Sequence, residues 1–253
     1  MAHEEEGIMK RVTTDYIKLI GIGLIVIMAV TIIARAFVNR NKAQELISVT
    51  GIGTVNFEAD LAVCSGDFRR VDMNLQNAYK LLNEDRKVVE DYLRKKGVDD
   101  KEITFSSISI NKEFQHIKEN STERDVFSGF QLSQSVRIES KNVDRVETVA
   151  REITEIINRG VEFYSMPPSY FYTKLDEVKL SVISEATKNA RMRAESIAKN
   201  SNGSLGDLKN ATLGVFQITA QNSDESLSWS GSYNTGSKKK TATTTVRLQY
   251  SVD

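Results

Sequence analysis

The strongest constraint on the fold of this chain is an uncharged apolar run near its N-terminus. Residues 19–34 read LIGIGLIVIMAVTIIA. With its apolar flanks, residues 17–38, the segment reaches about 20 residues, enough to cross the hydrocarbon core of a bilayer. A run that is apolar on every face is poorly suited to a half-buried core helix. We therefore predict a transmembrane helix at residues 17–38, preceded by a cytoplasmic tail at residues 1–16.

A cleaved signal peptide is the alternative for the same segment. Ala34-Arg35-Ala36 has the small-x-small form of a signal-peptidase site. The leading sequence MAHEEEGIMKRVTTDY is long and acidic, however, and the apolar run exceeds the usual length of a signal peptide. An uncleaved anchor is the favoured interpretation. Basic residues flank both ends of the run, so charge gives only a weak indication of orientation.

Composition excludes several classes of function. Lys and Arg total 34, and so do Asp and Glu, so no net charge favours nucleic acid as a partner. Cys64 is the only cysteine, which excludes an intrachain disulfide and a cysteine-based zinc site. The two histidines, His3 and His116, cannot form a His-rich metal site. The sequence therefore predicts no catalytic residue, no cofactor and no metal site.

Residues 39–45 are short and polar and are predicted to link the anchor to one domain, residues 46–253. Apolar residues at three- and four-residue spacing predict helices over about 72–96, 143–159 and 174–202. Ile157 and Ile197 are predicted to lie on the apolar faces of the second and third helices. Their predicted ends are marked by Gly97, Gly160 and Gly203 as left-handed terminators and by Asn142 and Thr173 as N-caps.

Alternation of apolar and polar residues predicts strands between the helices. The clearest cover 130–139 and 245–252, the pattern of a sheet with one solvated face. Weaker strand signals cover 46–57, 60–70, 103–114, 161–172 and 208–219. The order of elements predicts an α+β fold: one mostly antiparallel sheet with the three amphipathic helices packed on it.

Four stretches together resemble the SIMPL domain family, over residues 46–252. They are ISVTGIGTVNFEADLAV (47–63), KKGVDDKEITFSSISINKEF (95–114), FSGFQLSQSVRIESKNVDRV (127–146) and EATKNARMRAESIAKNSNGSLGDL (185–208). The first resembles the opening strand, Gly-x-Gly and short turn of the family. Here Glu58-Ala59-Asp60 keeps the Asp of that turn and lacks its Pro.

The resemblance implies a mixed α+β domain, export across the inner membrane and self-association. It implies no catalytic residue or cofactor, because the family has none established, and it links bacterial relatives to envelope or oxidative stress. We therefore expect a single-pass inner-membrane protein with its domain in the periplasm. The alternative is that the N-terminal segment is cleaved and the protein is secreted to the periplasm.

Two motifs that resemble functional sites are better explained without a function. Gly51 and Gly53 in Thr-Gly-Ile-Gly lack the third glycine and the following helix of a phosphate loop, so a bulge or tight bend between strand segments is expected. Cys64 and His116 are a conceivable nucleophile and base. Cys64 lies inside a predicted strand and nothing in the sequence orients His116, so catalysis there is not expected.

The segment 221–240, QNSDESLSWSGSYNTGSKKK, is predicted to be a long polar loop that contacts a partner. Long loops without secondary structure are often functional, and large aromatic residues in them suit binding. The candidate contacts are Trp229, Tyr233, Lys238, Lys239 and Lys240. The alternative is that Trp229 folds back onto the domain or that the loop is merely mobile.

The favoured function is a non-enzymatic, membrane-anchored homo-oligomer that scaffolds the cell envelope, with another envelope protein or peptidoglycan as a further candidate partner. The alternative is a binding module for a small envelope ligand or a peptidoglycan fragment, in which the sheet and the Trp229 loop line a pocket.

Overall fold

A computed structural model describes residues 23–36, 46–119, 122–226 and 228–252. Residues 23–36 form one α-helix. The predicted tail (1–16), the linker (39–45) and both ends of the predicted anchor lie outside the described residues. Among the helices described, none is both long and apolar enough to cross a membrane. The anchor therefore stays a prediction.

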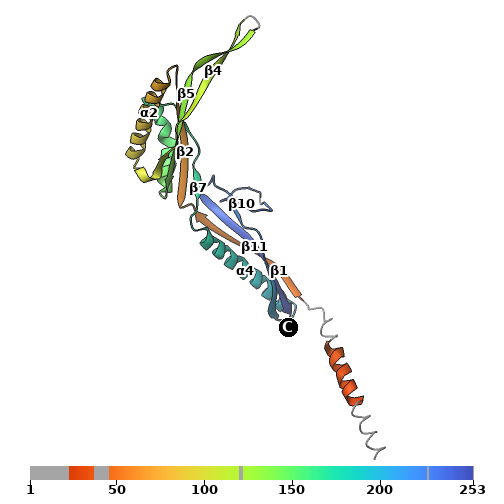
Figure 1. Cartoon of the computed structure of the whole chain (residues 1–253). Coiled ribbons are helices and arrows are strands. Elements are labelled where there is room, and N and C mark those ends of the chain that lie inside the picture. The colour runs from red at the N-terminus through yellow and green to blue at the C-terminus, as the bar shows by residue number, and fades with distance from the viewer. Residues whose placement is uncertain (1–22, 37–45, 120–121, 227, 253) are drawn as a thin grey trace, which may run out of the picture.

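Residues 46–252 form two β-sheets, each with helices on one face (Figure 1). Sheet A contains β1 (Leu46–Glu58), β8 (Leu205–Leu213), β9 (Gln217–Ala220), β10 (Ser232–Tyr233) and β11 (Lys239–Val252). Sheet B contains β2 (Leu61–Asp72), β3 (Ile103–Phe105), β4 (Ser109–Glu119), β5 (Thr122–Ser140), β6 (Phe163–Ser165) and β7 (Ser169–Phe171). The helices are α2 (Leu75–Lys95), α3 (Val143–Glu152) and α4 (Leu175–Asn200), with 3₁₀ turns η1 (Asp100–Glu102) and η2 (Ile153–Arg159).

The α+β class and the antiparallel pairing are confirmed, whereas the prediction of one sheet is wrong. All described strand pairs are antiparallel except β9 with β10. β1 pairs along its whole length with β11, and β2 pairs with β5, so the chain leaves sheet A for sheet B at Ala59-Asp60. Alternation within a strand identifies its buried face and not its neighbour, which is why the sequence did not separate the sheets.

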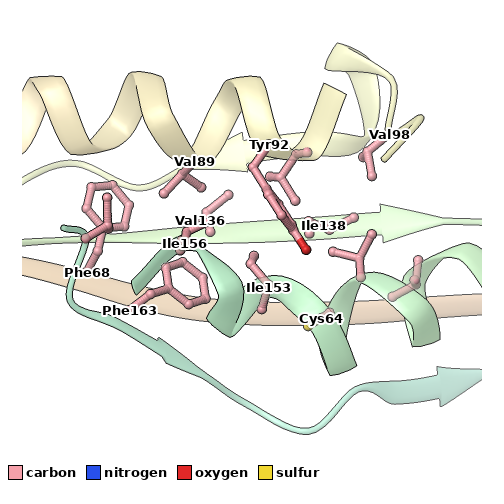
Figure 2. Close-up of a cluster of buried hydrophobic side chains, with 14 of the residues drawn as sticks. Cys64, Phe68, Val89, Tyr92, Val98, Val136, Ile138, Ile153, Ile156 and Phe163 are labelled. Atoms are coloured by element: carbon pink, nitrogen blue, oxygen red, sulfur yellow. The ribbon is translucent and has the colours of Figure 1, made fainter. Parts of the chain in front are cut away.

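The core of sheet B lies beneath α2, α3 and η2. Figure 2 shows Val89 and Tyr92 of α2 beside Val136 and Ile138 of β5, with side chains of η2 and β6 completing the cluster. The helix predicted over 143–159 changes to a 3₁₀ helix at Ile153. A 3₁₀ helix has three residues per turn, so Ile156 is buried. Ile157, predicted to lie on the apolar face, is exposed instead.

The core of sheet A is narrow because α4 lies very close to β1. The buried stripe of α4 is Val178, Val182, Ala186, Ala190, Ala194 and Ala198, while Ile197, predicted on this face, is exposed. A Cβ added at Gly51 would lie 2.2 Å from the Ala186 carbonyl oxygen, and one at Gly53 would lie 2.2 Å from that of Val182. β1 pairs with β11 through both glycines without a register shift, so the expected bulge or bend is wrong. The glycines instead permit close packing of α4 on the strand.

Most predicted helix ends are confirmed: Gly97 and Gly160 have positive φ, and the Asn142 side chain accepts the Arg145 backbone N–H. At α4, however, Lys174 is the N-cap, and Thr173 instead donates its N–H and hydroxyl to the Asp60 carboxylate, both at 2.7 Å. Asn202, and not Gly203, has the positive φ after α4. Asn tolerates this conformation because its short amide can bond locally.

Candidate functional site

The segment 221–240 is less of a loop than the sequence predicts. Ser232 and Tyr233 form β10, which pairs in parallel with β9, and Lys239 and Lys240 belong to β11. In Figure 1 the chain around β10 lies away from α4, on the other side of sheet A. The segment therefore covers part of the face of sheet A that α4 leaves open.

A buried glutamine holds the turn that carries Trp229. The Gln217 amide nitrogen donates to the Ser228 carbonyl at 2.5 Å, and its oxygen accepts from the Ser228 N–H and the Ser232 hydroxyl. The turn closes through a bond from the Gly231 N–H to the Ser228 carbonyl at 3.1 Å. Gly231 has a φ of 92°, which favours glycine. The backbone on both sides of Trp229 is thus fixed to the sheet.

Trp229 stands at the edge of an apolar cavity. Its side chain is 100% exposed, so the alternative in which it folds back onto the domain does not hold. A cavity of about 510 Å³ lies beside it. Its lining residues are Ile52, Gly214, Val215, Gln217, Ser228, Trp229, Thr243, Thr244 and Thr245. Large concave apolar sites with a few polar groups are where small ligands bind.

The polar groups of this cavity differ in their availability. The hydroxyl of buried Thr244 donates to the carbonyls of Gly214 and Val215, at 3.2 and 3.3 Å. The hydroxyls of Thr243 and Thr245, in the described part of the chain, make no hydrogen bond. They point away from α4 because successive side chains of a strand alternate between its faces. These two hydroxyls are available to a ligand.

Lys240 is fully buried and is not a surface contact. Its ammonium donates to the Asn234 carbonyl and lies 5.8 Å from the centre of the Tyr233 ring. Burial lowers the pKa of Lys240 to about 8, and the nearby Glu225 carboxylate acts in the opposite direction. The lysine cluster predicted as a binding surface is therefore partly interior, because β11 continues through it and turns Lys240 toward the core.

The other predicted contacts remain at the surface. Lys238 forms an ion pair with Asp144 of α3, and this contact raises the pKa of Lys238. The Lys239 ammonium lies 3.8 Å from a Glu58 carboxylate oxygen on β1. Tyr233 is exposed, and its ring lies beside the Lys240 ammonium. The structure thus brings Tyr233 and Lys240 together, whereas Lys238 and Lys239 point to different acidic neighbours and Trp229 lies at the cavity.

Cys64 and His116 lie in different surroundings. Cys64 is buried in the sheet B core, where burial raises the pKa of its thiol, and its sulfur donates to the Met166 carbonyl at 3.6 Å. His116 is exposed on β4 and pairs with Asp125 across the hairpin. The part of the chain that the structure describes also contains no group of three His, Cys, Asp or Glu side chains arranged to hold a metal.

Sequence reasoning missed a second exposed feature, the β4–β5 hairpin, which we call the arm. β2 ends at Asp72 opposite Phe130, and β4 and β5 continue beyond it as a two-stranded ribbon (Figure 1). Rings of Phe114, Phe127 and Phe130 form a row, with centroids 5.9 and 5.1 Å apart. Ile110 and Phe114 are 54% and 53% exposed. In the sequence, the phenylalanines at 114, 127 and 130 were the feature that could have indicated this arm.

Comparison with known protein families supports the resemblance found in the sequence. Residues 47–252 match the model of the SIMPL family, described as a protein of unknown function (DUF541). A search of curated proteins found no match.

Proposed function

The chain belongs to the SIMPL family, whose function is unknown, and we propose that it is a non-enzymatic, membrane-anchored protein of the cell envelope that assembles into a homo-oligomer through its arm. The alternative, ligand binding, concerns a different surface, the cavity beside Trp229. A role in envelope or oxidative stress has only the resemblance behind it.

The observation that carries the proposal is the exposed arm. A two-stranded ribbon is marginally stable by itself in water. Beyond Asp72, neither outer edge of the described ribbon pairs with another strand. Unpaired edges offer N–H and C=O groups to a further strand, and exposed apolar side chains favour association. A second copy of the arm meets both requirements, because it presents the same edges and the same aromatic row.

Three features support the remaining parts of the proposal. The side chains of the helix at 23–36 are exposed throughout, including Ile25, Met28 and Ile33, which suits contact with lipid. A domain outside the cytoplasm is what the family resemblance implies. A non-enzymatic role is consistent with the position of Cys64, whose buried thiol has a raised pKa and is a poor nucleophile.

The test is the mass of the full-length protein extracted in mild detergent, measured by light scattering together with the intact mass of its polypeptide. We expect a discrete multiple of an uncleaved chain. Phe114→Ser is expected to reduce the assembly to monomers. The matched control is Leu180→Ser, which changes an exposed residue of α4. A monomeric wild-type protein would refute the assembly, and equal masses for both variants would exclude the arm as its interface.

A further inference from the structure

We infer that the cavity beside Trp229 binds a neutral saccharide, with the sugar ring stacked on the Trp229 indole and its hydroxyls bonded to Thr243 and Thr245. This activity is independent of the proposed assembly, since the cavity lies on sheet A and the arm extends from sheet B. Three properties of the cavity favour a saccharide: the exposed Trp229 ring, the uncharged lining and the volume.

The backbone that carries Trp229 is held in place, while the indole ring itself is fully exposed. Gln217, itself buried, holds the turn through two hydrogen bonds with the Ser228 backbone and one from the Ser232 hydroxyl. The position of the backbone is therefore set before any ligand arrives, which lowers the conformational entropy lost on binding. An exposed indole is a large apolar surface, and covering one face of it is favourable. The indole therefore offers an uncovered face to a flat apolar surface.

The lining indicates a neutral ligand with both apolar and polar sides. None of the described residues that line the cavity is charged. Ile52, Val215 and Trp229 supply apolar surface, and the hydroxyls of Thr243 and Thr245 are unused. A pyranose ring has a face of C–H groups, which suits the electron-rich face of indole, and a rim of hydroxyls that donate and accept hydrogen bonds. A purely apolar ligand would leave both threonine hydroxyls without partners.

The dimensions agree with this class of ligand. The cavity of about 510 Å³ lies within the range of small-molecule sites, about 300 to 1,000 Å³. Thr243 and Thr245 are two residues apart on β11, so their Cα atoms are separated by about 6.8 Å. This spacing lets the two hydroxyls contact different positions of one sugar ring.

The experiment uses the tryptophan emission of the full-length protein in detergent, because Trp229 is the only tryptophan. Chitotriose and maltotriose serve as neutral probes, and an anilinonaphthalene sulfonate dye serves as an apolar probe. We expect a saturable change in emission with at least one sugar, with a Kd on the order of 1 mM or below. By calorimetry, Trp229→Ala is expected to abolish this binding and the Thr243→Val, Thr245→Val double variant to weaken it at least tenfold.

The matched control is Thr50→Val on β1, which changes a hydroxyl outside the cavity; it is expected to bind the sugar as the wild type does. Absence of saturable binding to either sugar would overturn the inference. So would sugar binding that survives Trp229→Ala, or dye binding at the cavity without sugar binding. Sugar binding can be measured whether the protein is a monomer or an oligomer. Failure of saccharide binding is therefore distinguishable from failure of assembly through the arm.

Discussion

The buried ammonium of Lys240 predicts a pH dependence of stability that a single substitution removes. In the folded chain this group has one carbonyl acceptor, on Asn234, and the face of the Tyr233 ring. Glu225 is the acidic group that acts on it. Water would solvate the ammonium better, so burial lowers the pKa of Lys240 from 10.5 to about 8. Lys240→Met retains much of the side-chain volume and removes the titrating group.

The direction in which stability changes with pH follows from the number of protons that the folded and unfolded chains bind. Below pH 8 the lysine is protonated in both the folded and the unfolded chain, so the cost of burying its charge is fully present. Between about pH 8 and 10.5 the folded chain releases the proton while the unfolded chain keeps it, so stability rises with pH. At 1.36 kcal/mol per pH unit, the gain between pH 7 and pH 10 is about 2 to 3 kcal/mol.

The assay is urea denaturation of the wild type and Lys240→Met at a series of pH values from 7 to 10. We expect the free energy of unfolding of the wild type to rise by this amount relative to the variant. The difference between the two proteins removes the contribution of other titrating groups. Lys239→Met, at the exposed neighbouring position, is the control and is expected to change with pH as the wild type does. A constant difference between the wild type and Lys240→Met would refute the reasoning.

Three further substitutions or treatments test the packing. Gly51→Ala is expected to lower the free energy of unfolding by about 2 to 3 kcal/mol, because the new Cβ meets the Ala186 carbonyl; an unchanged urea midpoint would contradict this close approach. Asp85→Ala is expected to cost about 3 kcal/mol by thermal denaturation, since it leaves the Arg70 guanidinium without its bidentate partner; a loss below about 1 kcal/mol would indicate that solvent replaces that partner. The Cys64 thiol is expected to react with an aromatic disulfide reagent only on unfolding, and rapid reaction of the folded protein would show that it is accessible.

The sequence alone determined the type and approximate position of most helices and strands. Apolar spacing and alternation are local properties, so the stripe of α2 and the buried faces of β5 and β11 follow from neighbouring residues. The caps Asn142, Gly97 and Gly160 were predictable for the same reason, because each acts within one turn of its own helix. Membership of the SIMPL family was also evident, because it depends on the order of short stretches along the chain.

The tertiary structure alone decided which strands pair and what surrounds each polar side chain. Pairing of β1 with β11 joins the two ends of the domain and divides the strands between two sheets, and no local pattern reports such a distant partner. Gly51 is explained only by the approach of α4, and Lys240 is buried only because β11 turns it inward. Likewise, the cavity beside Trp229 depends on Gln217 and Thr243 meeting across segments that are far apart in the chain. Such a site arises from packing, so its residues share no spacing that a sequence would show.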